Sequence, residues 1–144
     1  MSDDLVKLYS GRILALAADI PHLGRLPQPQ GSARRRSPLC GSTVTADVVL
    51  KDGRVAEFAQ DVKACALGQA AAGVVGAAAL GRSRAEIETA RLALATMLQE
   101  GGPPPAAPFA GFEALLPARD YRNRHASILL SIEALAEAMD VAMA

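Results

Sequence analysis

The sequence predicts an α+β fold in which helices cover one face of a small antiparallel sheet of about three strands. Residues 43–62 alternate between apolar and polar side chains on both sides of an Asp52-Gly53 pair, as in a β-hairpin with a tight turn. The segments before and after this hairpin carry apolar residues at helical spacing instead. Because strands and helices are segregated along the chain, an antiparallel sheet with helices on one face is expected.

The composition fits one folded domain, which we expect to span residues 1–144. Hydrophobic residues make up 51% of the chain and charged residues 21%, which is enough apolar material for a buried core. The 15 basic and 15 acidic residues balance, and aromatic residues make up only 3%. A chain with no excess of positive charge and few stacking side chains is not expected to bind nucleic acid or an anionic membrane.

Two segments bear on where the protein is located. The first four residues, MSDD, are acidic and lack the basic region of a signal peptide, so we expect a cytoplasmic protein. Residues 64–80 are apolar apart from Gln69, but the run is shorter than the about 20 residues that span a membrane and consists mostly of Ala and Gly. We interpret it as a buried helix whose small side chains let another backbone pack closely.

The segment before the hairpin is expected to contain one helix and one irregular stretch. Apolar residues recur at helical spacing over residues 3–19, and Pro21 ends the pattern. Residues 24–37 contain two prolines, Gly31 and three consecutive arginines. That content is typical of an exposed loop or an edge strand.

Three helices are expected after the hairpin. The small-residue helix begins at about Cys65 and ends near Ala79, and a second helix begins with a capping-box pattern at Ser83 and ends before a run of glycine and proline. Residues 101–118 are expected to form a flexible loop that is rich in Pro and Gly. A last helix is expected over residues 122–139, where apolar residues again recur at helical spacing.

Cys40 and Cys65, which flank the hairpin, have the most distinctive chemistry. Gly41 follows Cys40 and leaves room for a metal or a persulfide to approach the sulfur atom. Cys65 begins a helix, where unpaired backbone N–H groups stabilise a thiolate, the form that binds metal or attacks sulfur. Because a hairpin returns the chain to the edge from which it started, the two thiols are expected to lie close together.

His125, near the start of the last helix, is the candidate third ligand. Two thiolates and a neutral imidazole would suit zinc or an iron–sulfur cluster. The alternative is structural, because cysteine is often a small buried hydrophobe and this spacing is weaker than a CxxC…CxxC pattern. The sequence contains no P-loop, GxSxG or HExxH motif, so we expect no catalytic residues, only sulfur-accepting thiols, and no conventional enzyme.

Four segments of the chain resemble the IscU/SufU/NifU N-terminal family. In order they are LYSGRILALAADIPHLGRL, PLCGSTVTADVVLKDGRVAEF, DVKACALGQAAAG and LLPARDYRNRHASILLSIEAL. The family has a Leu-Tyr first helix, a Cys-Gly-Asp motif before a strand, a second Cys at a small-residue helix and a third Cys at the final helix. The segments keep this order over nearly the whole chain, and the long stretch before the last one resembles the SufU branch. The resemblance implies a SufE/NifU-like fold.

The resemblance also implies roles for individual residues. Cys40 and Cys65 match the first two family cysteines, whereas Ser42 stands where the family usually has Asp. The third cysteine is missing. If the tripeptide HAS is matched to the family's His-Cys-Ser, Ala126 occupies the vacant position; with a shift of one residue, His125 itself occupies it. Either alignment leaves Cys40, Cys65 and His125 as a possible Cys₂His ligand set.

The family accepts sulfur from a cysteine desulfurase, assembles a [2Fe–2S] or similar cluster and passes it to recipient proteins. The resemblance therefore implies an iron–sulfur cluster assembly scaffold or sulfur acceptor that holds iron or a transient cluster. A second hypothesis is a zinc-bearing sulfur-transfer partner of the desulfurase, as in SufU-like members. A third is a metal-free interaction module that keeps the fold.

Overall fold

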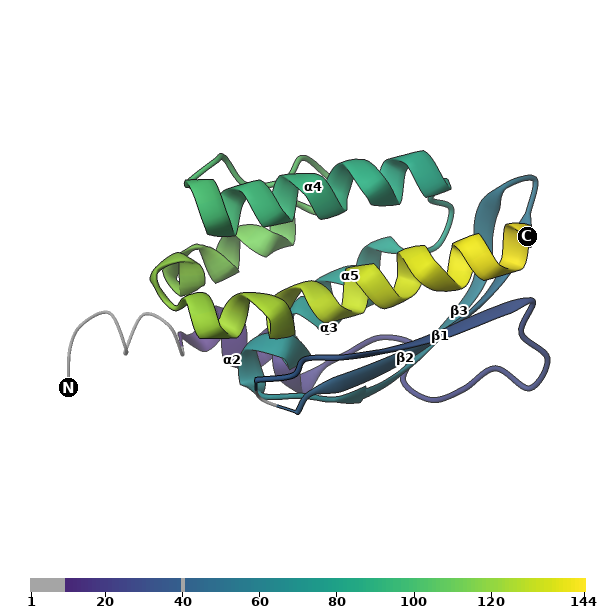
Figure 1. Ribbon diagram of the computed structural model, residues 1–144, viewed down its shortest axis with the longest axis horizontal. Helices are drawn as coiled ribbons and strands as arrows, with labels where there is room; N and C mark the ends of the chain where they lie inside the picture. Colours follow the sequence, from purple (N-terminus) through teal and green to yellow (C-terminus); the bar gives the residue numbers. More distant parts are fainter. Residues whose placement is uncertain (1–9, 40) are drawn as a thin grey trace.

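The computed structural model describes residues 10–39 and 41–144, so Cys40 and the first half of the expected N-terminal helix lie outside the described residues. Figure 1 shows how the elements are arranged. Their bounds are α2 Gly11–Ala18, β1 Gly31–Arg36, β2 Thr43–Lys51, β3 Arg54–Lys63, α3 Ala66–Ala78, α4 Arg84–Glu100, the 3₁₀ helix η1 Ala110–Asp120 and α5 Arg122–Met143.

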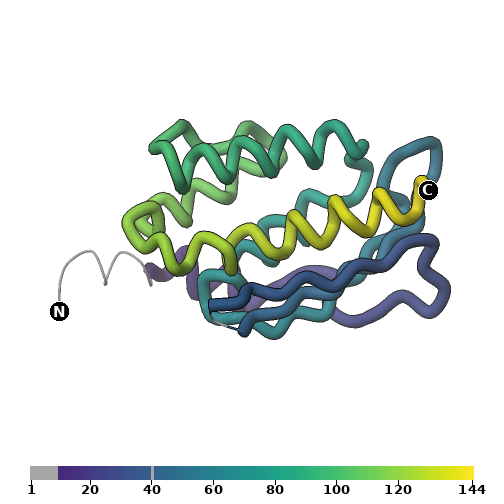
Figure 2. Tube along the Cα trace, viewed as in Figure 1, coloured from purple at the N-terminus to yellow at the C-terminus, as the bar shows by residue number. Residues whose placement is uncertain are grey.

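The sheet has three antiparallel strands in the order β1-β2-β3, which confirms the predicted α+β class. The stretch at 24–37, expected to be a loop or an edge strand, contains the edge strand β1. Asp52 and Gly53 form the turn between β2 and β3 with φ values of 54° and 76°. Those positive values are the ones that an Asp-Gly pair adopts in a tight hairpin. The long helices lie on one side of the sheet, and α4 forms an outer layer over α5 (Figures 1 and 2).

Alternation along β2 determines which face of the sheet is buried under the helices. Val44, Ala46 and Val48 are at most 1% exposed, and they belong to the same apolar core as Ile132 and Leu135 of α5. Helix α5 is therefore central to the fold, because it packs on β1 and β2 on one side and on α3 and α4 on the other. Any side chain on the first turns of α5 is fixed relative to the ends of the strands.

Asp47 is on the opposite face of β2 and ties the loop before β1 to the sheet. Its side chain is fully buried and accepts hydrogen bonds from Arg25 at 2.7 and 3.1 Å, from the Ser32 hydroxyl at 2.6 Å and from the backbone N–H of Leu26 at 3.0 Å. Burial alone would raise the pKa of Asp47, but these donors outweigh it and hold the pKa below its ordinary value.

Small residues in α3 let other parts of the chain approach its backbone, as the sequence predicted. A Cβ on Gly73 would lie 2.5 Å from the carbonyl oxygen of Leu16 in α2, and one on Gly76 would lie 2.8 Å from that of Pro21. Either addition would push the neighbouring backbone away, since real Cβ atoms essentially never come so close. Helix α3 is thus wedged between α2 and α5.

The sequence predicted the start of α4 correctly but did not predict the helix η1. The capping box at the start of α4 is present: Ser83 accepts from the backbone N–H of Glu86, and the Glu86 side chain accepts from that of Ser83. By contrast, the second half of the loop expected at 101–118 is the helix η1. Its side chains Phe112 and Leu115 are fully buried, and this burial holds the segment against the core.

None of the helices in the described residues is both long and apolar enough to cross a membrane.

Candidate functional site

Cys65 lies at the junction between β3 and α3. It is the N-cap residue of α3, with extended backbone angles of φ −67° and ψ 170°, and no side chain caps this helix start. The thiol is free and partly exposed. Cys65 therefore stands at the start of α3, as the sequence predicted.

Ser127 of α5 faces the Cys65 thiol. Its Oγ lies 3.4 Å from the Cys65 Sγ and donates a hydrogen bond of 3.2 Å to the Oγ of Ser42, which directly precedes β2. Both serines are buried, with 1% and 4% exposure. Gly68 makes the approach possible, because a Cβ there would lie 2.7 Å from the Ser127 Oγ. Three elements thus meet at a short row of polar side chains.

This row can respond to the charge of the sulfur. A serine hydroxyl has one proton to donate and two lone pairs that accept. While Ser127 donates to Ser42, it can accept the proton of the Cys65 thiol. When that thiol is a thiolate, rotation of the same hydroxyl lets it donate to the sulfur instead, and a hydrogen bond to an ionised acceptor is the stronger kind.

Cys40 lies outside the described residues, but the loop that carries it has described ends. The backbone N–H of Ser37 donates to the carbonyl of Ser42 at 2.8 Å, and the N–H of Gly41 donates to the carbonyl of Ser37 at 2.9 Å. Gly41 has a φ of 70°, the left-handed conformation that favours glycine, and Leu39 is 75% exposed. The closed loop joins β1 to β2, and its end residue Ser42 belongs to the row of polar side chains beside Cys65.

Two cations flank the same end of the sheet. Arg36, Thr43 and Lys63 are in register across β1, β2 and β3, so they share one face. Arg36 and Lys63 are exposed, and both strands carry them at the end where Cys65 follows.

His125 has a different environment from the one expected of a third ligand. Its ring is 6% exposed, and its Nε2 lies 3.1 Å from the carbonyl oxygen of Ala118 and 3.0 Å from that of Arg119. Two carbonyl acceptors fix the proton on Nε2, so only Nδ1 is left with a free lone pair. His125 and Ser127 are two residues apart on a helix, so their side chains point about 200° apart. The structure therefore brings Ser127, rather than His125, to Cys65, and it uses His125 to anchor η1 on α5.

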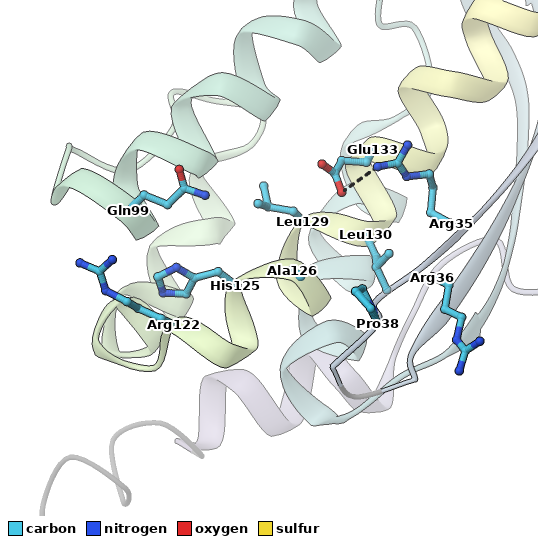
Figure 3. Close-up of a pocket in the computed structure, with 10 residues that line it drawn as sticks. All are labelled: Arg35, Arg36, Pro38, Gln99, Arg122, His125, Ala126, Leu129, Leu130 and Glu133. Atoms are coloured by element: carbon cyan, nitrogen blue, oxygen red, sulfur yellow. Dashed lines mark ion pairs between the residues drawn. The ribbon is translucent and has the colours of Figure 1, made fainter.

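Because Cys40 lies outside the described residues, the predicted Cys₂His set remains a prediction. Among these residues no group of three or more His, Cys, Asp and Glu side chains is placed to hold a metal ion. Ala126 is partly exposed and lines an open trough beside α5 (Figure 3). Sequence reasoning missed Ser127, although its place in the run RNRHASILL, next to the vacant cysteine position, was a usable signal.

Comparison with known proteins gives a clear structural match. No family model and no curated protein matches the chain. The crystal structure of the N-terminal part of a nitrogen-fixing NifU-like protein from Brucella abortus matches with a TM-score of 0.95 and 40% identity over 98% of both chains. A protein from Fervidobacterium islandicum AW-1, assigned as the iron–sulfur cluster assembly scaffold of the SUF system, matches with a TM-score of 0.81 and 18% identity, covering 93% of this chain and 98% of its own. The first match is similar enough in sequence to show a family relationship, whereas the second shows only that the fold is shared.

Proposed function

The chain belongs to the IscU/SufU/NifU N-terminal family, and on that premise we propose that it accepts sulfur from a cysteine desulfurase and holds a nascent iron–sulfur cluster for transfer to recipient proteins. It acts as a carrier in the cytoplasm, where thiols stay reduced, rather than as an enzyme. The shared fold with the Fervidobacterium protein, assigned as the iron–sulfur cluster assembly scaffold of the SUF system, supports this role.

One observation carries the proposal. The Cys65 thiol is partly exposed at the start of α3, against the buried hydroxyls of Ser127 and Ser42. In sequence, Cys40 is separated from Ser42 by Gly41 alone. A purely structural cysteine would instead be enclosed among apolar side chains.

The sulfur step follows from these groups. The Cys65 thiolate attacks the outer sulfur of a persulfide on the desulfurase, and a new S–S bond forms as the old one breaks. The desulfurase cysteine leaves as a thiolate and takes up a proton from water. The hydroxyl of Ser127 and the N–H groups at the start of α3 stabilise the attacking thiolate before the transfer.

The donor set favours transient binding of iron over a permanent metal site. Cys40 and Cys65 supply two soft thiolates, which suit iron–sulfur clusters and zinc. Ser42 supplies a neutral hydroxyl where the family usually has a carboxylate, and Ala126 supplies no donor at all. His125 can be a third ligand only through Nδ1, since its Nε2 donates to the carbonyls of η1.

Anaerobic reconstitution with iron and sulfide tests the scaffold role. We expect visible absorption from a bound cluster in the wild type and its loss in Cys40→Ser and in Cys65→Ser. Metal analysis of the freshly purified protein distinguishes the zinc hypothesis from the cluster-scaffold hypothesis, because the zinc hypothesis requires about one zinc per chain and no iron. A protein that stays colourless and also takes up no sulfur at either cysteine would leave only the metal-free interaction module.

A further inference from the structure

Strand β1 forms an open edge of the sheet, whereas the outer edge of β3 is covered. Within the residues that the structure describes, β1 has β2 as its only strand partner. On β3, Gln60 exchanges backbone hydrogen bonds with His22 and Gly24. Val55 does the same with residues 81–82. No comparable backbone pairing covers the outer side of β1 in the described part of the chain, and such an edge is a template for pairing with another polypeptide.

Arg34 and Arg36 direct their backbone groups toward the open edge of β1. The N–H of Ser37 donates to the carbonyl of Ser42, so this pair bonds across β1 and β2. In an antiparallel pair, successive residues direct their N–H and C=O groups alternately toward the partner strand and away from it. Counting back from Ser37, Arg35 bonds to β2, whereas Arg36 and Arg34 each present a donor and an acceptor to the open side. The matching row of acceptors and donors is the backbone of an extended peptide.

The same two arginines place positive charge on the face of the sheet that points away from α5. Arg34 and Arg36 are two positions apart on β1, so their side chains share one face. Figure 3 shows Arg35 reaching toward Glu133 of α5, while Arg36 points to the other side. Arg34 and Arg36 are exposed and make no ion pair with any residue that the structure describes. Each can therefore receive a carboxylate without displacing an existing partner.

The other charges in these rows of the sheet leave the positive sign in place. Lys63 of β3 lies in the row of Arg36, and Asp61 of β3 lies in the row of Arg34, with β2 between the outer strands. Neighbouring strands are about 4.8 Å apart, so about 10 Å separate the backbones of β1 and β3. Asp61 makes no ion pair with Arg34. The two rows thus set Arg34, Arg36 and Lys63 against one carboxylate, and their field favours a negatively charged partner.

A second copy of the chain does not suit the open edge of β1. If two β1 strands paired over most of their length, residues 34–36 of one copy would lie beside those of the other. Like charges directly opposite each other destabilise a strand pair. Charged side chains protect an edge against unwanted pairing, and the single sign of these charges makes the protection selective. A strand with carboxylates at alternate positions would instead place them beside Arg34 and Arg36, and guanidinium groups suit carboxylates geometrically.

We propose that the open edge of β1 docks an extended segment of a partner protein as an added strand, with carboxylates at alternate positions beside Arg34 and Arg36. Strand β1 leads into the loop that ends at Ser42, which accepts a hydrogen bond from Ser127 beside Cys65. The added strand therefore reaches the end of the sheet that carries the proposed sulfur site. The docking edge follows from backbone geometry and charge; only the nature of the partner, a sulfur donor or a cluster recipient, rests on the proposed function.

The probe for this edge is a fluorescein-labelled peptide of alternating glutamate and valine, titrated with the full chain and followed by fluorescence anisotropy. In a paired strand, alternate N–H groups of the peptide face β1 and the others face solvent. We therefore expect N-methylation of one alternate set to abolish binding and N-methylation of the other set to preserve it. The two methylated peptides carry the same charge. Equal affinities would show that charge alone holds the peptide and would overturn the proposal.

Charge reversal on β1 tests the role of the side chains. We expect Arg34→Glu and Arg36→Glu each to weaken binding about tenfold, since each reversal removes an attraction and adds a repulsion. Arg12→Glu is the matched control, because Arg12 is exposed on α2, which packs on α3, and makes no ion pair with a described residue. A peptide of alternating lysine and valine should bind the double variant Arg34→Glu/Arg36→Glu and not the wild type. A misfolded variant would bind neither peptide.

Three further results would overturn the proposal: no binding of the glutamate–valine peptide to the wild type, equal weakening by Arg12→Glu, or displacement of the peptide by inorganic phosphate at matched ionic strength. Sulfur uptake at Cys65, measured in the presence of excess desulfurase, keeps the two proposals separate. A wild type that takes up sulfur but does not bind the peptide refutes the docking edge alone. A wild type that binds the peptide but takes up no sulfur refutes the sulfur-acceptor role alone.

Discussion

The Oγ of Ser127 lies 3.4 Å from the Sγ of Cys65, so the last helix of the chain touches the thiol that begins α3. These two residues are 62 positions apart in sequence, and only the packed fold brings them together. The contact gives Cys65 a hydroxyl partner that can accept from a thiol and donate to a thiolate.

Removing the Ser127 hydroxyl should make Cys65 less reactive. In a Cys40→Ser background, we expect Ser127→Ala to slow alkylation of Cys65 by iodoacetamide several-fold at neutral pH, because the thiolate loses a donor. Ser131→Ala is the matched control, since Ser131 is equally buried in α5 but donates to Gln60 at 2.8 Å. Equal alkylation rates in the parent and in Ser127→Ala would show that the contact has no chemical role.

Adding one methyl group at Gly68 should disturb the same contact from the other side. A Cβ there meets the Ser127 Oγ, so we expect Gly68→Ala to lower the free energy of unfolding by about 1–3 kcal/mol through overpacking. Gly11→Ala in α2 meets nothing within 4 Å and should instead raise stability by about 0.5–1 kcal/mol. Urea denaturation measures both. A stabilised Gly68→Ala protein would mean that α3 and α5 have room to separate.

Asp47 should make stability depend on pH at the acid end. Its pKa is held below the ordinary value in the folded state, so its stabilising contribution is complete above about pH 4 and is lost as the pH falls through the folded-state pKa. We expect Asp47→Asn to cost about 2 kcal/mol at pH 7 and to flatten the loss of stability below pH 4. Thermal melts across this range check both effects; parallel curves for the two proteins would contradict the assignment.

The variant His125→Ala tests whether His125 holds η1 against α5 or binds a metal ion. Because Nε2 donates to the carbonyls of η1, we expect this variant to lose about 1–3 kcal/mol of unfolding free energy while it keeps wild-type sulfur uptake at Cys65. Calorimetry and mass spectrometry on the same preparation measure the two quantities. Unchanged stability with loss of bound iron or zinc would show that His125 acts as a ligand through Nδ1.

Most of the fold could be predicted because its signals are local. The alternation along β2, the Asp52-Gly53 turn and the capping box at Ser83 each depend on residues close together in sequence, and the structure confirms all of them. The 3₁₀ helix η1 was missed for the opposite reason. Proline and glycine signal the end of α4, but the burial of Phe112 and Leu115 against other elements keeps the chain ordered afterwards.

The site was harder to predict because it depends on which face of α5 each side chain occupies. Sequence order placed His125 near Cys65, but one position along a helix turns a side chain by about 100°. Ser127 faces the thiol, and His125 contacts the carbonyls of Ala118 and Arg119. The resemblance to the family could not settle this point, since the third cysteine that would define the register is absent from this chain.

Mass spectrometry of sulfur uptake tests the central claim most directly. The protein is incubated anaerobically with a cysteine desulfurase and its cysteine substrate, its thiols are blocked, and its peptides are analysed. We predict one added sulfur atom on the peptide containing Cys65, in the wild type and in Cys40→Ser, and none in Cys65→Ser. A Cys65 peptide that keeps an unmodified thiol while the desulfurase turns over would contradict the claim that Cys65 is the sulfur acceptor.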